Sequence, residues 1–517
     1  MNRGPQADRA RLDRFDLLVG LGAFLAAAAY LIALHQHELW GDGQGLYDRL
    51  ERGADPWWSL HYHAAYLPVV RFLAWAAPTA LTYDGYLLAS SLPTAAGLVF
   101  VLWSLRLLGV GRGGALAVAV ACSLTPALVL FGTLLEVHAL HFGGVAFAVW
   151  LSLVALRAPT RRGVLCVQAL AFFAVSATHS TAPVLVPGWA AWCTALLWLE
   201  RNEETRAIGA RRTFVVSAIG ATAALAVTAL IIEFGWRANR SEGGLSFIVS
   251  VVDQALESVA PRRILAEWVL AYGWALAPLA FSLLLLRHGP TRRAIVANTK
   301  PLLAAWLVWM IVPMLALNVW SVANLGGYTA GLAPMFAIGL GAVLVQLESP
   351  PLRRAWIAVA ALAALVQPIA SGWQIAEREA RFLEWRPEVH AEAVAALPEG
   401  GTLLTYSPLE YNLSVFEPEW RQVNVYFLLR VRADGTFQHE PRSWVLHELV
   451  RPGGPVVLDL RFRAAPIPAR TPLAAQRDAF DAALEEFFEF EAVPPEVGLV
   501  AVLRPKPEAV ARARSQR

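Results

Sequence analysis

Lysine, cysteine and charged residues are all scarce in this chain of 517 residues. It has two lysines, Lys300 and Lys506, three cysteines, and a charged fraction of only 16%. The cysteines, Cys122, Cys166 and Cys193, fall inside apolar runs, so neither a disulfide framework nor a CxxC metal site is available. So little charge excludes a soluble globular protein.

What the chain has instead is apolar surface. Hydrophobic residues make up 57% of it, with 20 Trp, 23 Phe and 11 Tyr. Such a composition excludes a disordered chain and indicates a protein of the lipid bilayer. Because 43 basic residues nearly balance 40 acidic ones, the net charge of +3 gives no case for nucleic-acid binding.

Apolar runs long enough to cross a membrane recur through the first 373 residues. A transmembrane helix needs about 20 mostly apolar residues. The sequence predicts about eleven spans, at 15–34, 84–105, 113–131, 137–156, 164–178, 182–199, 213–232, 263–286, 302–322, 327–347 and 354–373. The apolar stretch 62–78 is short and holds prolines, which indicates an interfacial or re-entrant helix.

The arginines predict the orientation of these spans. With the N-terminus inside, every even connection is basic, from Arg106 and Arg112 to Arg353 and Arg354. A miscounted span would move this excess to the other side from that point onward, and no such change occurs. The preference for arginine over lysine is typical of proteins encoded by GC-rich bacterial genomes. We therefore predict a multi-pass protein of the bacterial inner membrane with a cytoplasmic N-terminus and an extracytoplasmic C-terminal part.

The composition changes after residue 373. Charges become frequent, and amphipathic stretches (374–397, 472–490) alternate with β-like runs at 402–406, 423–429, 456–460 and 499–503. The predicted domains are thus a transmembrane domain, 1–373, and a soluble α/β domain, 374–517. The predicted fold class is an α-helical polytopic membrane protein with an extracytoplasmic α/β domain.

Ionisable residues gather at the predicted outer ends of the spans. Seven of the eleven histidines fall there: His35, His37, His61, His63, His138, His141 and His179. Carboxylates share that side, among them Glu38 and Asp42 in the first outer loop and Glu136 before the fourth span. Because ionisable groups at membrane depth are costly, this convergence predicts an outward-facing active site.

The first outer loop presents its carboxylate between glycines. Gly41, Gly43 and Gly45 flank Asp42, giving a backbone that can hold the side chain in a turn. A carboxylate there can take a proton from an incoming hydroxyl group. The structural alternative is that Asp42 caps a short helix that begins near Gly43.

Histidines and arginines supply the other candidates. His61-Tyr-His63, Glu136-Val-His138 and His179 can contact a substrate, or they can be interfacial side chains bonded to carbonyls or water. The same residue types can bind a divalent metal, but their spacing is a weak signal for one.

The loop after the seventh predicted span holds Arg237 and Arg240 on the outer side, where arginine is usually rare. Guanidinium groups suit bidentate binding of phosphate. The alternative is that these side chains are solvated or contact lipid headgroups.

Four motifs, in this order, resemble the GT-C superfamily of membrane glycosyltransferases that use polyprenyl-phosphate sugars, and within it the bacterial protein O-mannosyltransferase-like branch. They are Asp42-Gly-Gln-Gly-Leu, His63 with Pro68 five residues on, Glu136-Val-His-Ala-Leu140, and Thr178-His-Ser-Thr181 before Pro187. The resemblance covers about the first 200 residues. Gln44 departs from it where the family often has a carboxylate, and Ala64-Ala65 replaces expected prolines and glycine.

The resemblance implies an inverting glycosyltransferase whose donor is a polyprenyl-phosphate-linked sugar and whose acceptor is a glycan, lipid or protein hydroxyl. Asp42, Glu136 and His63 are then the catalytic candidates, with Asp42 as general base. The substrate-binding candidates are His61, His138, His179, Glu38, Arg237 and Arg240. No cofactor is expected, and the partners besides the substrates are membrane lipids.

Three other functions stay open at this point. A transporter or flippase also keeps ionisable residues in a helix bundle, although no internal repeat is evident. A polysaccharide polymerase or ligase would depend on the outer-loop arginines rather than on Asp42. A scaffold without activity would need none of these residues.

Overall fold

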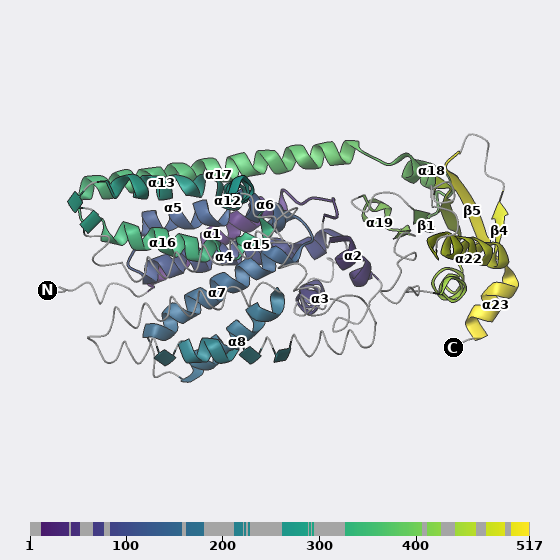
Figure 1. Cartoon of the computed structure of the whole chain (residues 1–517), viewed down its shortest axis with the longest axis horizontal. Helices are drawn as coiled ribbons and strands as arrows, with labels where there is room; N and C mark the ends of the chain where they lie inside the picture. Colours follow the sequence, from purple (N-terminus) through teal and green to yellow (C-terminus); the bar gives the residue numbers. More distant parts are fainter. Residues whose placement is uncertain are drawn as a thin grey trace. The chain divides into compact units, whose positions relative to one another are not determined.

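The computed structural model describes residues 12–40, 43–51, 66–76, 83–157, 162–179, 326–405, 411–424, 440–461, 472–491 and 498–515, and parts of 211–227 and 261–293. The chain forms two compact units (Figure 1). Unit 1 comprises Met1–Gln36, Trp40–Gly235 and Gly244–Arg378, and unit 2 comprises His37–Leu39, Trp236–Gly243 and Glu379–Arg517.

Unit 1 is helical in all its described secondary structure. Its helices are α1 Arg14–Ile32, α2 Gly43–Glu51, α3 Tyr66–Ala76, α4 Tyr83–Leu107, α5 Arg112–Ser123, α6 Pro126–Thr133, α7 Val137–Arg157, α8 Arg162–Thr178, α12 Pro261–Tyr272, α13 Leu276–Leu285, α15 Gly327–Ala330, α16 Ala333–Gln346 and most of α17 Pro350–Glu384. Five helices of the described chain are long and apolar enough to cross a membrane, or six if α5 and α6 form one bent span.

The helices α4 and α7 pack closely in the interior of unit 1. A Cβ atom on Gly143 of α7 would lie 2.5 Å from the carbonyl oxygen of Pro93 of α4, so only glycine allows this approach. In contrast, the outer helix α1 exposes Leu18, Leu21 and Leu25. Apolar side chains on an outer surface of this kind suit contact with lipid. The protein is a polytopic membrane protein, as predicted.

The count of about eleven spans stays a prediction, since 182–199 and 302–322 lie outside the described residues. Three predicted spans are interrupted in the structure, among them 327–347, which is divided between α15 and α16. The span 113–131 is broken between α5 and α6, which meet at 65°, because Thr125 caps α6 and Pro126 occupies its first turn. The span 263–286 is interrupted by a 3₁₀ turn, Gly273–Ala275, where Gly273 has a φ of 49°.

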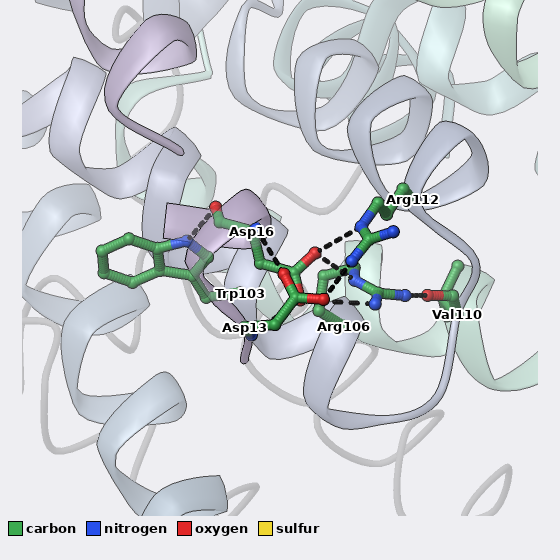
Figure 2. Close-up of polar contacts among 6 residues, drawn as sticks. All are labelled: Asp13, Asp16, Trp103, Arg106, Val110 and Arg112. Carbon is green, nitrogen blue, oxygen red and sulfur yellow. Dashed lines mark hydrogen bonds and ion pairs between the residues drawn. The ribbon is translucent and has the colours of Figure 1, made fainter. Parts of the chain in front are cut away.

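A buried carboxylate ties three helix ends together in unit 1 (Figure 2). Asp16 accepts from Arg106 Nε (2.9 Å) and Arg112 Nε (3.0 Å), and its carbonyl accepts from the Trp103 indole (3.2 Å). Asp13 caps α1 through the Asp16 N–H and also pairs with Arg112. Arg106 and Arg112, which the arginine pattern predicts on the N-terminal side of the membrane, thus lie at the same end of the bundle as the start of α1.

In its described residues, unit 2 forms one mixed five-stranded sheet. Its strands are β1 Thr402–Thr405, β2 Arg421–Asn424, β3 Val456–Asp459, β4 Phe488–Glu491 and β5 Val500–Pro505, in the order β2-β1-β3-β5-β4. β1 is parallel to both β2 and β3, and β5 is antiparallel to both β3 and β4. The described helical segments are α18 Glu388–Ala396, α19 Leu413–Phe416, α20 Pro441–Trp444, the π-helix Val445–Val450, α22 Pro472–Phe487 and α23 Pro507–Ser515.

Helices cover both faces of this sheet. Leu403 and Val457 pack in one apolar cluster with α18, whereas Leu404, Val456 and Leu458 pack in a second with α22 and α23. Alternate residues of β1 and β3 therefore face opposite layers, as in a sheet buried on both sides. The α/β class predicted for the C-terminal part agrees with this arrangement. The helix predicted over 472–490 was wrong at its end, because β4 begins at Phe488 and pairs with β5.

Candidate active site

Glu136 lies in the short connection between α6 and α7 of unit 1. It is buried, and its Oε2 accepts the N–H of Val137 at 2.9 Å, at the first turn of α7. A carboxylate in this position is favoured by the unpaired N–H groups at the start of a helix. The side chain of Tyr66, on α3, is fully buried and close enough to Glu136 to interact with it electrostatically.

Three buried imidazoles gather beside the start of α7. His138 and His141 are three residues apart on α7 and therefore share one face of the helix. His179, which follows α8, has its ring centroid 4.9 Å from that of His138 and 5.0 Å from that of His141. Elements distant in the sequence thus bring three histidines together, and Glu136 lies two positions before the first of them.

A hydrogen bond orients one of these rings. His141 Nδ1 lies 3.1 Å from Thr178 Oγ1, and this hydroxyl donates its proton to the Val175 carbonyl at 2.6 Å. Because a hydroxyl has one proton to donate, His141 Nδ1 carries the proton of this bond. Thr178 therefore fixes both the orientation and the tautomer of His141.

Aromatic and backbone groups enclose His138. Its ring packs edge-on against Phe131 of α6, with 4.7 Å between centroids. On another side the backbone of α15 approaches so closely that a Cβ on Gly327 would lie 2.7 Å from His138 Cδ2. Neither Phe131 nor Gly327 was predicted as part of the site, and no chemical signal in the sequence distinguishes them.

The structure brings together two of the predicted site residues, His138 and His179, and Glu136 is buried two positions before His138. His141, which belonged to the outer histidines of the sequence but not to the predicted substrate contacts, joins them. Asp42, His61, His63, Arg237 and Arg240 lie outside the described residues, so their places in a site stay predictions. Glu38 is half-buried and belongs to unit 2, whereas the imidazole cluster belongs to unit 1.

Two further histidines of the predicted outer group have other contacts. His35 Nε2 lies 2.8 Å from Ser91 Oγ of α4, and His35 Nδ1 lies 3.6 Å from the Asp84 carboxylate. His37 binds Glu379, which no pattern in the sequence indicated. Among the described residues, no group of three or more His, Cys, Asp or Glu side chains has the arrangement of a metal site.

This arrangement resembles that of known membrane proteins at the level of the whole fold. The structure of ArnT from Cupriavidus metallidurans bound to undecaprenyl phosphate has a TM-score of 0.58 to this chain at 14% identity, over 95% of this chain and 98% of ArnT. The apo state of ArnT gives a TM-score of 0.54 over the same shares. The chain has the GT-C fold. The superfamily resemblance of the sequence motifs is confirmed for the fold, and the O-mannosyltransferase-like branch stays a prediction.

Sequence comparisons do not reach this GT-C fold. No protein-family model and no curated protein matches the chain. The apo oligosaccharyltransferase of Archaeoglobus fulgidus has a TM-score of 0.46 at 13% identity, over 94% of this chain and 74% of its own.

Proposed function

We propose that this protein is an integral membrane glycosyltransferase that moves a sugar from a polyprenyl-phosphate donor to an acceptor hydroxyl. The fold, shared with ArnT along almost the whole chain, supports this function, since ArnT was solved with undecaprenyl phosphate bound. The observation that carries the proposal is the buried cluster of His138, His141 and His179, which the fold assembles from separate elements, with Glu136 buried at the start of the same helix α7. The acceptor is a glycan, a lipid or a protein.

The proposed reaction is a single displacement with inversion. Asp42 accepts the proton of the acceptor hydroxyl while the acceptor oxygen attacks the anomeric carbon of the sugar. The bond from this carbon to the phosphate oxygen breaks in the same step, and polyprenyl phosphate leaves with the bonding electrons. A general base contributes about 10² to 10⁴-fold to such a rate. Glu136 and His63 are the other proposed catalytic groups.

The leaving phosphate gains negative charge, which donor groups in a site shielded from water stabilise strongly. Imidazole N–H groups and guanidinium groups are suitable donors. The proposed substrate contacts are His61, His138, His179, Glu38, Arg237 and Arg240. The proposed step uses no cofactor, and a divalent ion held by imidazole and carboxylate groups is the alternative.

The proposal includes a location. The protein belongs to a bacterial inner membrane, with its N-terminus in the cytoplasm and both the site and unit 2 on the extracytoplasmic side. The basic connections on the N-terminal side support this orientation, as does the presence of Arg106 and Arg112 at the same helix ends as Asp16.

Mass spectrometry of envelope glycans, lipids and glycoproteins tests the function. A strain that lacks the gene should lose one sugar modification, and the wild-type gene should restore it. Asp42→Asn should fail to restore it at an unchanged protein level in the membrane. Asp478→Asn is the matched control, because Asp478 is an exposed carboxylate on α22.

Each outcome assigns the function differently. Full restoration by Asp42→Asn would refute the proposed base. Longer or shorter polysaccharide chains, with no sugar residue missing, would favour a polymerase or ligase. Accumulation of the lipid-linked sugar on the cytoplasmic side would favour a flippase.

A further inference from the structure

The chain between α1 and α2 is fixed at its start. Gln36 is fully buried, its Nε2 donates to Thr133 Oγ1 at 2.6 Å, and its N–H donates to the Thr133 carbonyl at 3.0 Å. Thr133 is the last residue of α6, three positions before Glu136. These two hydrogen bonds fix the start of the first outer loop to the end of α6, just before the candidate site.

The next residue is held by α17. The N–H of His37 donates to the Glu379 carboxylate, at 3.1 Å from Oε2, and His37 Nδ1 lies 2.7 Å from Oε1. An ionised carboxylate only accepts hydrogen bonds, so Nδ1 carries the proton. The imidazole also packs against Phe416, with 5.6 Å between ring centroids. One carboxylate thus fixes both the backbone and the side chain of His37 within unit 2.

Arg378, which precedes Glu379 on α17, contacts the loop at Trp40, three residues after His37. The guanidinium of Arg378 lies 4.8 Å from the ring centroid of Trp40, within the range of a cation–π interaction. The Trp40 carbonyl accepts the N–H of Gly43 at 2.8 Å. This bond joins the residues on either side of the Gly41-Asp42 pair.

The loop is also fixed after Gly43. Tyr47 of α2 is buried and packs edge-on against Tyr83 and Tyr86 of α4, at 5.6 Å and 6.4 Å between centroids. Described contacts therefore hold the chain on both sides of Asp42.

We infer that Arg378 and Glu379 are positioning residues for Asp42. Successive residues of an α-helix point about 100° apart, so neighbouring positions of α17 hold the loop in different directions, Arg378 at Trp40 and Glu379 at His37. Catalysis by a general base depends on its placement, and a displacement of about 1 Å can cost about 100-fold in rate. The inference rests on the proposed function, because it assigns these contacts to the placement of the proposed base.

Hydrogen exchange of the full-length protein in nanodiscs gives a test that needs no substrate. In Glu379→Gln and Arg378→Gln, we expect the amides of residues 36–51 to exchange about tenfold faster, while those of α4 and α7 exchange as in the wild type. Arg378→Lys keeps the cation and should retain most of the protection. Glu384→Gln is the matched control, since Glu384 is an exposed carboxylate on the same helix.

Kinetics with the donor identified from the envelope analysis give the second measurement. Glu379→Gln and Arg378→Gln should lower kcat about tenfold and leave KM for the donor within twofold, because the loop places the base rather than the lipid. Unchanged exchange in both variants would overturn the inference whatever their activity. Faster exchange with unchanged kcat would overturn it as well. If Asp42→Asn keeps full activity, the proposed base is wrong, and that result is distinct from either outcome for α17.

Discussion

His390, on α18 of unit 2, makes the stability of that unit dependent on pH. Its side chain is fully buried, and neither ring nitrogen has a hydrogen-bond partner within the described part of the chain. Burial, together with the positive charges of Arg386 and Arg461 and against the opposing effect of Asp459, lowers the pKa of His390 from its ordinary value of 6.5 to about 3. The folded unit therefore keeps this imidazole neutral.

The sign of the effect follows from proton binding. Between about pH 3 and pH 6.5 the unfolded chain binds a proton at His390 that the folded unit excludes. The free energy of unfolding therefore has its full value at pH values well above 6.5. It falls as the pH drops from 6.5 toward 3, because the unfolded chain gains a proton at His390. With these two pKa values, lowering the pH from 7.5 to 5 should cost about 2 kcal/mol at this one residue.

Hydrogen exchange of β1 and β3 in the full-length protein measures this change, after correction for the pH dependence of intrinsic exchange. We expect protection of these strands to fall between pH 7.5 and pH 5 in the wild type. His390→Leu should remove about 2 kcal/mol of that fall. His447→Leu is the control, because it removes an exposed imidazole of the same unit. A pH dependence of equal size in wild type and His390→Leu would refute the reasoning.

Two further substitutions test unit 1. Asp16→Asn should lower the free energy of unfolding by about 1–3 kcal/mol, because it leaves the Arg106 guanidinium without its carboxylate; thermal unfolding in detergent measures the loss. Asp13→Asn, whose side chain is 54% exposed, should cost less than about 1 kcal/mol, and equal losses would contradict this account. Gly327→Ala should weaken binding of undecaprenyl phosphate about tenfold in native mass spectrometry, because the new Cβ would lie 2.7 Å from the His138 ring. Gly22→Ala, with no atom within 4 Å of its Cβ, should bind normally, and normal binding by both variants would refute a role for His138 there.

The ends of helices were harder to predict from the sequence than their presence. Hydropathy predicted a span that ends at Trp373 and a separate amphipathic helix after it, but α17 continues through this point to Glu384. A fall in hydropathy marks a change of solvent, whereas a helix ends where a residue disfavours it. No glycine or proline occurs between Trp373 and Glu384, and the helix stops just before Pro387.

Long-range pairing explains the other misplaced element. The helical pattern of 472–490 runs into β4, whose residues Phe488 and Phe490 alternate with glutamates as in a half-buried strand. What decides the matter is the pairing of Phe490 with Leu503 of β5, which local patterns do not contain.

The sequence predicted those parts of the candidate site that follow from counting membrane spans. Counting spans put His138, His141 and His179 at one end of the bundle, and the structure brings their rings within 5.0 Å in each neighbouring pair. The contact between His37 and Glu379 joins residues 342 positions apart, and no pattern in a single sequence indicates such a pair. Whether Asp42 and His63 join the cluster stays a prediction.

Because α17 is one continuous helix, it fixes the distance and the angle between the side chains along it. Its 35 residues extend about 52 Å, at about 1.5 Å per residue, while the hydrocarbon core of a bilayer is about 30 Å thick. A single residue inserted after Trp373 would turn everything beyond it by about 100° and shift it by about 1.5 Å. Arg378 would then face away from Trp40, although no side chain had changed. The number of residues along this helix therefore determines the contact between Arg378 and Trp40 as much as the identity of these two side chains does.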